Sequence, residues 1–320
     1  MTLVTLSDVR QARTVVAPYV HHTPIFSAST LGQMLGIELY FKAELFQKTG
    51  SFKVRGALNK VNSLTPDEKA RGVIAISAGN HAAGLAYAAS VMGTQARIVM
   101  PESAVKAKVE ATRSYGGIPV LHGDMKGLMT RARELQDEHQ LTFVHPFDDP
   151  YIIAGQGTVG LEILEDLPDV DVVLAPIGGG GLASGVAAVV KALRPSARVI
   201  GVEPVGAAAM HASLQAQRPV TLEQIQTVAD GLAAPFGGEH TLAHIKALVD
   251  EVVLVTDADI IEAMFMVMER SKLFVEPAAA AGFAALLAHK AAVQPGERVV
   301  CILSGGNVDR ERIKHILNTP

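Results

Sequence analysis

The sequence has very little cysteine and few aromatic residues. Its 320 residues include one cysteine and no tryptophan, and aromatic residues make up only 5%. A single thiol cannot form an intrachain disulfide, and alone it cannot supply a cysteine-based metal site. Cys301 lies in the apolar run 299–303, so we expect it to be buried in the core. Such sparing use of cysteine is typical of a reducing compartment, and we predict a cytoplasmic protein.

The chain also lacks an excess of positive charge and a long apolar run. Its net charge is −4, so we expect neither a nucleic acid nor an anionic membrane as partner. Residues 1–10 have no apolar signal-peptide region. The longest uncharged stretch, 172–190, contains Pro176 and four consecutive glycines, which favours a strand, a loop and a helix over a membrane span.

Aliphatic residues are abundant, and hydrophobic residues make up 49% of the chain. Short β-branched runs alternate with longer helical patterns, which predicts a doubly wound α/β fold with parallel sheets. Threonine followed three positions later by an acidic residue predicts helix starts at Thr65 and Thr256. We predict strands at 73–76, 97–100, 119–121, 172–175, 199–202, 252–255 and 299–303. We predict helices at 80–92, 103–114, 126–138, 152–165, 182–193, 258–273 and 278–289.

The order of these elements predicts two domains. Residues 73–146 form a compact alternation of strands and helices, and we predict a small mobile domain there. Residues 1–72 and 147–320 would then form one discontinuous large domain. Within it, residues 203–250 have few strand signals and are predicted as helices and loops at the edge of the sheet.

Lys53 lies in the run 48–56, whose residues suit a buried reactive amine. A free lysine, with a pKa of ~10.4, is almost fully protonated at neutral pH and is a poor nucleophile. Burial, or a Schiff base with an aldehyde cofactor, removes that charge. Gly50 and Gly56 allow close backbone approach, and Phe52 offers a flat apolar face. For this run alone, a surface lysine at a helix start is the alternative.

Small and polar residues follow two further predicted strands. The turn Ser77–His81 follows the strand 73–76, and its backbone N–H groups could hold a carboxylate. Asn80 could donate from its side-chain amide to an oxygen on a ring. Ser304 follows the strand 299–303 and would lie at the carboxyl edge of the sheet. Ordinary strand-ending turns are the alternative at both places.

Four consecutive glycines, Gly178 to Gly181, follow the strand 172–175 and precede a helix. Glycine leaves the backbone N–H groups open to phosphate oxygens, so this run predicts a phosphate cradle. It is not a P-loop, because no Gly-Lys-Ser/Thr follows it. It matches the dinucleotide fingerprint only loosely, and Glu203 has no clear ribose role. A flexible turn without phosphate is the alternative.

In their order and spacing, these four motifs resemble those of the fold-type II pyridoxal-phosphate enzymes, in particular the serine/threonine dehydratase and serine racemase group. The resemblance runs over almost the whole chain and includes 145–150, 153–158, 229–231 and 275–278. It implies two doubly wound open sheets with pyridoxal 5'-phosphate between the domains. It also implies a homodimer that acts on a small amino acid.

The resemblance assigns a role to each motif. Lys53 would form a Schiff base with the cofactor, Phe52 would pack near the pyridine ring, and Asn80 would donate to the phenolic oxygen. Ser304 would meet the pyridine nitrogen. Backbone N–H groups for the phosphate would come from Gly178, Gly179, Gly180, Gly181 and Leu182. The substrate carboxylate would bind Ser77, Ala78, Gly79, Asn80 and His81.

The implied reaction is β-elimination from a β-hydroxy amino acid, L-threonine or L-serine, giving a 2-oxo acid and ammonia. A neutral hydroxyl at Ser304 holds a ring proton weakly, which favours elimination over transamination. Lys53 would take the Cα proton, and the cofactor phosphate would be the acid for the leaving hydroxide. Alternatives are dehydration of 3-hydroxyaspartate or phenylserine, or serine racemisation. The chain ends soon after Ser304, so we expect no C-terminal regulatory domain.

Two positions depart from the family's patterns. Racemases carry a proton-exchanging serine where this chain has Ala78, so we predict little racemisation. Metal-binding members have a glutamate and, six residues later, an aspartate, but here Ala209 follows Glu203. We therefore predict no metal site, or at most a weak one at Glu203 and the carbonyl of Ala207. Glu203 alone is expected to be a solvated or paired carboxylate.

Three other functions fit parts of the sequence. A synthase of the same fold would share the lysine and the glycine run, but the Ser-Phe-Lys-x-Arg-Gly-Ala run and the Ser-Ala-Gly-Asn-His turn favour a dehydratase. A binding protein without activity is the second alternative. A nicotinamide oxidoreductase is the third, and only the glycine run supports it.

Overall fold

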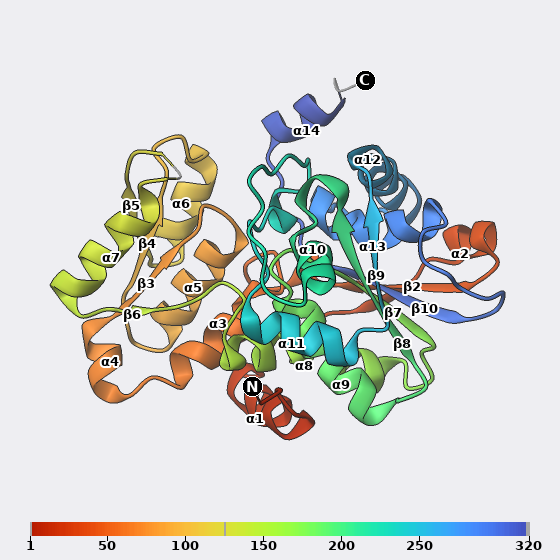
Figure 1. Cartoon of the computed structure of the whole chain (residues 1–320), viewed down its shortest axis with the longest axis horizontal. Helices are drawn as coiled ribbons and strands as arrows, with labels where there is room; N and C mark the ends of the chain where they lie inside the picture. Colours follow the sequence, from red (N-terminus) through yellow and green to blue (C-terminus); the bar gives the residue numbers. More distant parts are fainter. Residues whose placement is uncertain (1, 125, 318–320) are drawn as a thin grey trace.

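The computed structural model describes residues 2–124 and 126–317, arranged around two sheets (Figure 1). The larger sheet has six strands in the order β1-β2-β10-β7-β8-β9, and all neighbours pair in parallel except β1 and β2. Its strands are β1 (Ile25–Ser27), β2 (Glu38–Ala43), β7 (Val172–Pro176), β8 (Arg198–Pro204), β9 (Glu251–Val255) and β10 (Arg298–Leu303). The last four of these were predicted from the sequence, whereas β1 and β2 were missed.

The smaller sheet has four parallel strands in the order β5-β4-β3-β6. They are β3 (Val73–Ile76), β4 (Ala96–Met100), β5 (Ile118–Leu121) and the two-residue β6 (Thr142–Phe143). All four come from one continuous stretch of the chain, which lies apart from the larger sheet in Figure 1. The strand β6 was not predicted, because two residues give no periodic signal.

Helices cover both faces of the larger sheet, as its apolar strands require. Val172 and Leu174 face α12 (Asp257–Met266) and α13 (Pro277–Leu287), whereas Val173 and Ala175 face α8 (Pro150–Asp166), α9 (Gly181–Leu193) and α11 (Glu239–Leu248). Successive strand residues point to opposite faces, so a strand buried on both sides is apolar throughout. The smaller sheet is covered in the same way by α3 (Lys53–Asn62), α5 (Asn80–Val91), α6 (Lys106–Ser114) and α7 (Leu128–His139).

Local signals place several helix ends. The capping boxes at Thr65 and Thr256 are confirmed, and they begin α4 (Pro66–Arg71) and α12. The helix predicted over 258–273 is shorter than expected, because its last turns form the π-helix η4 (Val267–Ser271). Elements not predicted individually are α1 (Leu6–Val16), α2 (Ser29–Leu35), α3, α10 (Ala209–Ala216), α11, α14 (Arg310–Leu317) and the 3-10 turns η1 (Glu44–Phe46), η2 (Val205–Ala207) and η3 (Asp230–Leu232).

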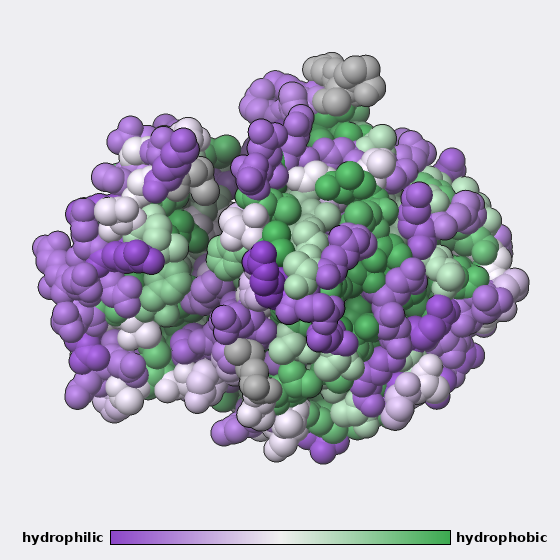
Figure 2. All heavy atoms as spheres, in the orientation of Figure 1, coloured by the Kyte–Doolittle hydropathy of each residue, from purple (hydrophilic) through white to green (hydrophobic). Residues whose placement is uncertain are grey.

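The surface and the core agree with the composition. Cys301 is fully buried, and burial raises the pKa of its thiol. On the face drawn in Figure 2, hydrophilic side chains cover most of the part built on the smaller sheet, and apolar side chains gather toward the middle of the larger part. Within the described ranges, every helix is too short or too polar to cross a membrane.

Candidate active site

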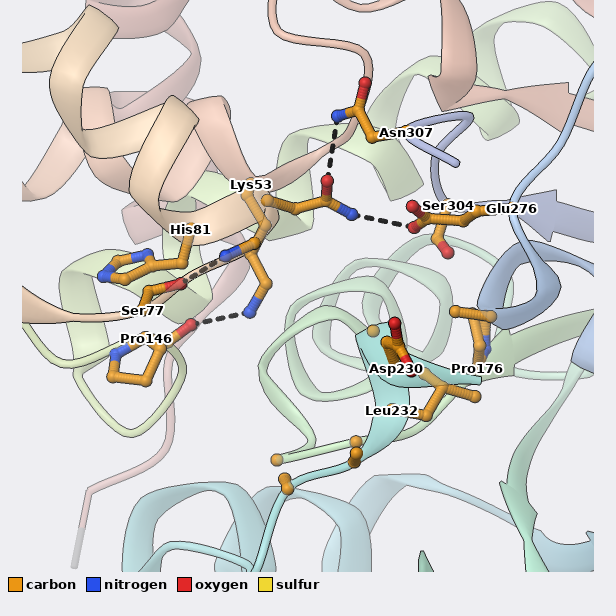
Figure 3. A pocket seen from close by; sticks show the side chains of 18 of the residues that line it. Lys53, Ser77, His81, Pro146, Pro176, Asp230, Leu232, Glu276, Ser304 and Asn307 are labelled. Atoms are coloured by element: carbon orange, nitrogen blue, oxygen red, sulfur yellow. Dashed lines mark hydrogen bonds between the residues drawn. The ribbon is translucent and has the colours of Figure 1, made fainter. Parts of the chain in front are cut away.

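A pocket of about 450 Å³ lies where the carboxyl ends of strands from both sheets come together. This volume is within the range of roughly 300–1,000 Å³ that small-molecule sites occupy. Every residue that the sequence pointed to as a cofactor or substrate ligand lines this pocket (Figure 3). Four segments from distant parts of the chain supply them: 52–53, 77–81, 178–182 and 304.

Lys53 is the first residue of α3, and its side chain is half-buried in the pocket wall. Its Nζ donates to the carbonyl of Pro146 at 2.9 Å and lies 5.3 Å from the ring centre of Phe52. Among the ion pairs of the described residues, none involves Lys53. Burial lowers the pKa of Lys53 to about 8, although the charge of Glu276 opposes this shift. Lys53 thus begins a helix, as the alternative stated, but its side chain lines a pocket.

The loop before Lys53 is joined to the loop that carries Ser304. Ser51 forms an isolated β-bridge with Gly305, and the N–H of Phe52 donates to the carbonyl of Ser304 at 3.2 Å. Ser304 directly follows β10, as its position after an apolar strand predicted. The reactive lysine and the candidate ring-nitrogen ligand are thus held together by backbone hydrogen bonds.

Asn80 begins α5, and its amide has two side-chain partners. Its Nδ2 donates to Oε1 of Glu276 at 2.7 Å, and its Oδ1 accepts from Nδ2 of Asn307 at 2.8 Å. Burial raises the pKa of Glu276 to about 7. Glu276 was considered only within the range 275–278, and no role was predicted for it or for Asn307. Only the tertiary contact with Asn80 indicates one.

The glycine run turns the chain from β7 into α9. Gly180 has a φ of +92°, a conformation that disfavours any residue with a Cβ. A Cβ added to Gly179 would lie only 2.2 Å from the ring of Phe147. Packing against Phe147 and the positive φ therefore require glycine at these two positions, and the run lines the pocket at the start of α9, where a helix N-terminus suits a phosphate.

The turn after β3 presents small side chains and a neutral histidine. Ser77 Oγ accepts from the N–H of Gly79 at 3.2 Å, and Ala78 presents only a methyl group. His81 is buried, with Nε2 3.2 Å from the carbonyl of Val144. Burial, with the nearby charge of Lys53, lowers the pKa of His81 to about 3, so this imidazole is neutral at physiological pH.

The candidate metal position lies outside the pocket. Glu203 is fully buried, and its carboxylate accepts from the N–H groups of Met210 and His211 at 2.8 and 2.7 Å. It therefore caps the start of α10, and the expectation of a solvated or paired carboxylate is wrong. Across the described ranges, no group of three or more His, Cys, Asp or Glu side chains is arranged to hold a metal ion.

Comparison with known proteins identifies the family. The sequence profile described as pyridoxal-phosphate dependent enzyme matches residues 16–305. The chain belongs to this family. It is 44% identical to an L-threonine ammonia-lyase of Thermotoga maritima over 99% of this chain and 79% of that protein. It is 42% identical to a serine racemase of Oryza sativa over 95% of this chain and 91% of that one.

Solved structures of this family share the fold. Maize serine racemase, 40% identical, has a TM-score of 0.93 over 99% of this chain and 97% of its own. The processed form of threonine deaminase isoform 2 from Solanum lycopersicum, 36% identical, has a TM-score of 0.90 over 98% and 94%. The predicted fold-type II architecture is thereby confirmed, and the cofactor is pyridoxal phosphate. The pocket fits this group, because its lining offers an amine with a lowered pKa and a run of four glycines at the start of a helix.

Proposed function

We propose that this protein eliminates water from a β-hydroxy amino acid, L-threonine or L-serine, and that the resulting imine takes up one water on hydrolysis, which releases a 2-oxo acid and ammonia. The observation that carries the proposal is the amine of Lys53, which has no carboxylate partner among the described residues and a pKa near 8. Such an amine can bind an aldehyde and later accept a proton. Relatives named L-threonine ammonia-lyase, and a catabolic L-threonine dehydratase of Staphylococcus aureus at 41% identity, support this assignment.

Different residues of the pocket would bind different parts of the cofactor. Lys53 would bind its aldehyde carbon, Asn80 its phenolic oxygen and Ser304 its ring nitrogen, with Phe52 against the ring. When bound, pyridoxal phosphate supplies a conjugated ring that withdraws electrons from Cα of the substrate. The phosphate would be held by backbone N–H groups of Gly178, Gly179, Gly180, Gly181 and Leu182.

The chain's own groups then determine the outcome. Lys53, once free, accepts the Cα proton, because its surroundings favour the neutral amine. The hydroxyl of Ser304 does not hold a proton on the ring nitrogen as an aspartate would, so loss of the β-hydroxyl is favoured over transamination. The turn Ser77–His81 receives the substrate carboxylate. Ala78 has no proton to give, so exchange on the opposite face of Cα is disfavoured.

The lining of the pocket favours threonine and serine over 3-hydroxyaspartate. Phe147 and residues 232–235 give it an apolar stretch that suits a methyl group. Besides Lys53, the Lys and Arg residues in the described lining are Lys108 and Arg312, and both face Asp230, at 3.8 and 2.9 Å. A second carboxylate would therefore find no free cation. Asp148, the residue after Phe147, does not line the pocket but caps α11 through the N–H groups of Glu239 and Thr241.

The assembly and organisation are proposals as well. Residues 73–146 would form the small mobile domain, and 1–72 with 147–320 the large one, with the Lys108–Asp230 pair between them. A homodimer would cover exposed Phe26 and Phe46, whose rings lie 6.0 Å apart. Cytoplasmic location would suit the single buried thiol.

The decisive experiment is a panel of β-hydroxy amino acids scored for 2-oxo acid and ammonia. Threonine and serine should give both products, and 3-hydroxyaspartate and phenylserine should give little. A sulfide-dependent product from an activated serine, without 2-oxobutyrate from threonine, would identify a synthase instead. Interconversion of L- and D-serine at rates close to dehydration would favour the serine racemase alternative and overturn the role given to Ala78.

A further inference from the structure

Asn307 links two parts of the pocket that are distant in sequence. Its Nδ2 donates to the carbonyl of Thr49, in the loop that precedes Lys53, at 2.8 Å. The same Nδ2 donates to Oδ1 of Asn80, at the start of α5, also at 2.8 Å. Asn307 belongs to the lining of the pocket and is labelled in Figure 3. A Cβ added to Gly50 would lie only 2.3 Å from Oδ1 of Asn307. Any side chain at position 50 would therefore collide with this amide.

The hydrogen-bonding capacities of these groups fix the orientation of both amides. A backbone carbonyl can only accept, so the carbonyl of Thr49 requires the nitrogen of Asn307 on its side. That nitrogen has a second hydrogen, which requires the oxygen of Asn80 to face it. The nitrogen of Asn80 must then point the other way, toward Glu276 and the pocket. If Asn80 were flipped, two N–H donors would face each other.

Glu276 cannot fix this orientation by itself. Burial raises its pKa to about 7, so a large share of its carboxyl groups carry a proton at neutral pH. A protonated carboxyl can donate as well as accept, and it would satisfy either end of the Asn80 amide. The other titratable groups in the described lining are Lys53, His81, Lys108, Asp230, Asp309 and Arg312, and the side chain of Asn80 forms its hydrogen bonds with Glu276 and Asn307 instead.

We propose that Asn307 is a positioning residue, which turns the amide nitrogen of Asn80 toward the cofactor's phenolic oxygen. This inference rests on the proposed role of Asn80 as the partner of that oxygen. It gives Asn307, which lies three residues after Ser304, a function separate from that of Ser304. The side chain of Asn307 acts through Asn80 and does not itself touch the reacting atoms.

The test uses the cofactor-loaded protein and its absorption spectrum. Asn307→Asp keeps the size of the side chain but removes both donors, so Asn80 should flip and present its oxygen to the phenolic oxygen. The phenolic oxygen would then keep its proton more often, which transfers absorption from the longer-wavelength band to the shorter one. The ratio of the two bands should change by about threefold or more, as expected for one hydrogen bond. The dissociation constant of the cofactor should rise by a similar factor.

Matched variants separate positioning from a general structural role. Asn62→Asp makes the same chemical change at an exposed residue on α3 and should leave the band ratio unchanged. Asn307→Ala leaves Asn80 free to turn and should give an intermediate ratio, which also serves if Asn307→Asp folds poorly. In an Asn80→Ala background, Asn307→Asp should add nothing, because its effect passes through Asn80.

The outcomes distinguish this inference from the proposed function. A wild-type protein that gives no visible band with pyridoxal phosphate would overturn the proposed cofactor site itself. A wild-type protein with a normal band and activity, but with unchanged spectra in both Asn307 variants, would overturn only the role of Asn307. If Asn307→Asp changed the band ratio as strongly in the Asn80→Ala background as in the wild type, the role of Asn307 would also be overturned.

Discussion

Two groups of buried charges flank the start of α3, and they differ in whether each charge has a partner. Arg55 is fully buried and bonds Glu44 at 2.8 Å and Glu162 at 2.6 Å, and Lys42 meets Glu162 at 2.8 Å. Two residues away from Arg55, Lys53 has only the carbonyl of Pro146. One helix therefore begins with an unpaired cation and continues with a cation held by two carboxylates.

The pKa shifts follow this difference in pairing. Burial lowers the pKa of Arg55, but Glu44 and Glu162 more than offset this, and the net pKa is raised. For Glu162, burial raises the pKa, and Arg55 with Lys42 lowers it below its usual value. For Lys53, only the charge of Glu276 opposes burial, and burial outweighs it and takes the pKa down to about 8. The charge of Arg55 is thus held by its carboxylate partners, whereas the amine of Lys53 has no such ion pair and remains reactive.

The largest expected effect comes from removing the unpaired charge. Lys53→Ala should lower the elimination rate by at least about 10³-fold, since it removes both the cofactor's attachment and the base at Cα. Its unfolding free energy should change little. Lys42→Met is the matched control: it should keep the visible cofactor band but lose stability, because Glu162 loses a partner. Turnover by Lys53→Ala near the wild-type rate would refute the assignment.

The next largest effect is on the unfolding free energy and comes from the ion pairs of Arg55 with Glu44 and Glu162. Arg55→Met leaves Glu44 without its cation, and the unfolding free energy at pH 7 should fall by about 3–5 kcal/mol. In the wild type, the folded-state pKa of Glu162 is depressed, so its contribution is present above its unfolded pKa and is lost as the pH falls. Urea unfolding at pH 7 and pH 4 should therefore show a smaller penalty for Arg55→Met at pH 4. An equal penalty at both pH values would contradict the ionic explanation.

A smaller effect measures the pKa of Lys53 directly. Cofactor-free protein should capture pyridoxal phosphate faster as the pH rises, with a midpoint near 8, because only the neutral amine attacks the aldehyde. Glu276 raises the pKa of Lys53, so Glu276→Gln should move the midpoint down by up to about one unit. Glutamine keeps an acceptor oxygen for Asn80, which leaves that contact in place. A midpoint near 10 in the wild type would mean that Lys53 is solvated.

The sequence predicted the part of the site that depends on local motifs. Lys53, Asn80, the glycine run and Ser304 each follow or precede a strand or helix, and parallel strands bring such ends to one edge. The strand β2 was missed because Glu38 and Lys42 interrupt its apolar run. Lys42 is nevertheless buried, and the carboxylate that allows this lies on α8. No local pattern reveals a pair formed between residues so far apart.

The same reason explains why Glu276 and Asn307 were given no role. Each acts on Asn80, which is far away in the sequence. Glu276 precedes Pro277 at the start of an apolar helix, and this pattern alone predicts a helix cap. A buried carboxyl with a raised pKa becomes visible only when the fold encloses it.

The smallest expected effect is at Glu203, a buried carboxyl whose pKa burial raises to about 7 and which pairs with no cation among the described residues. Two N–H groups at the start of α10 satisfy its carboxylate, so a chelator should leave the elimination rate unchanged. Ala209→Asp should place a second carboxylate close to Glu203 and lower the melting temperature through like-charge repulsion. Added Mg²⁺ or Ca²⁺ should restore that temperature in the variant and not raise it in the wild type. A wild-type melting temperature that rises with either ion would show that backbone N–H groups do not replace a metal here.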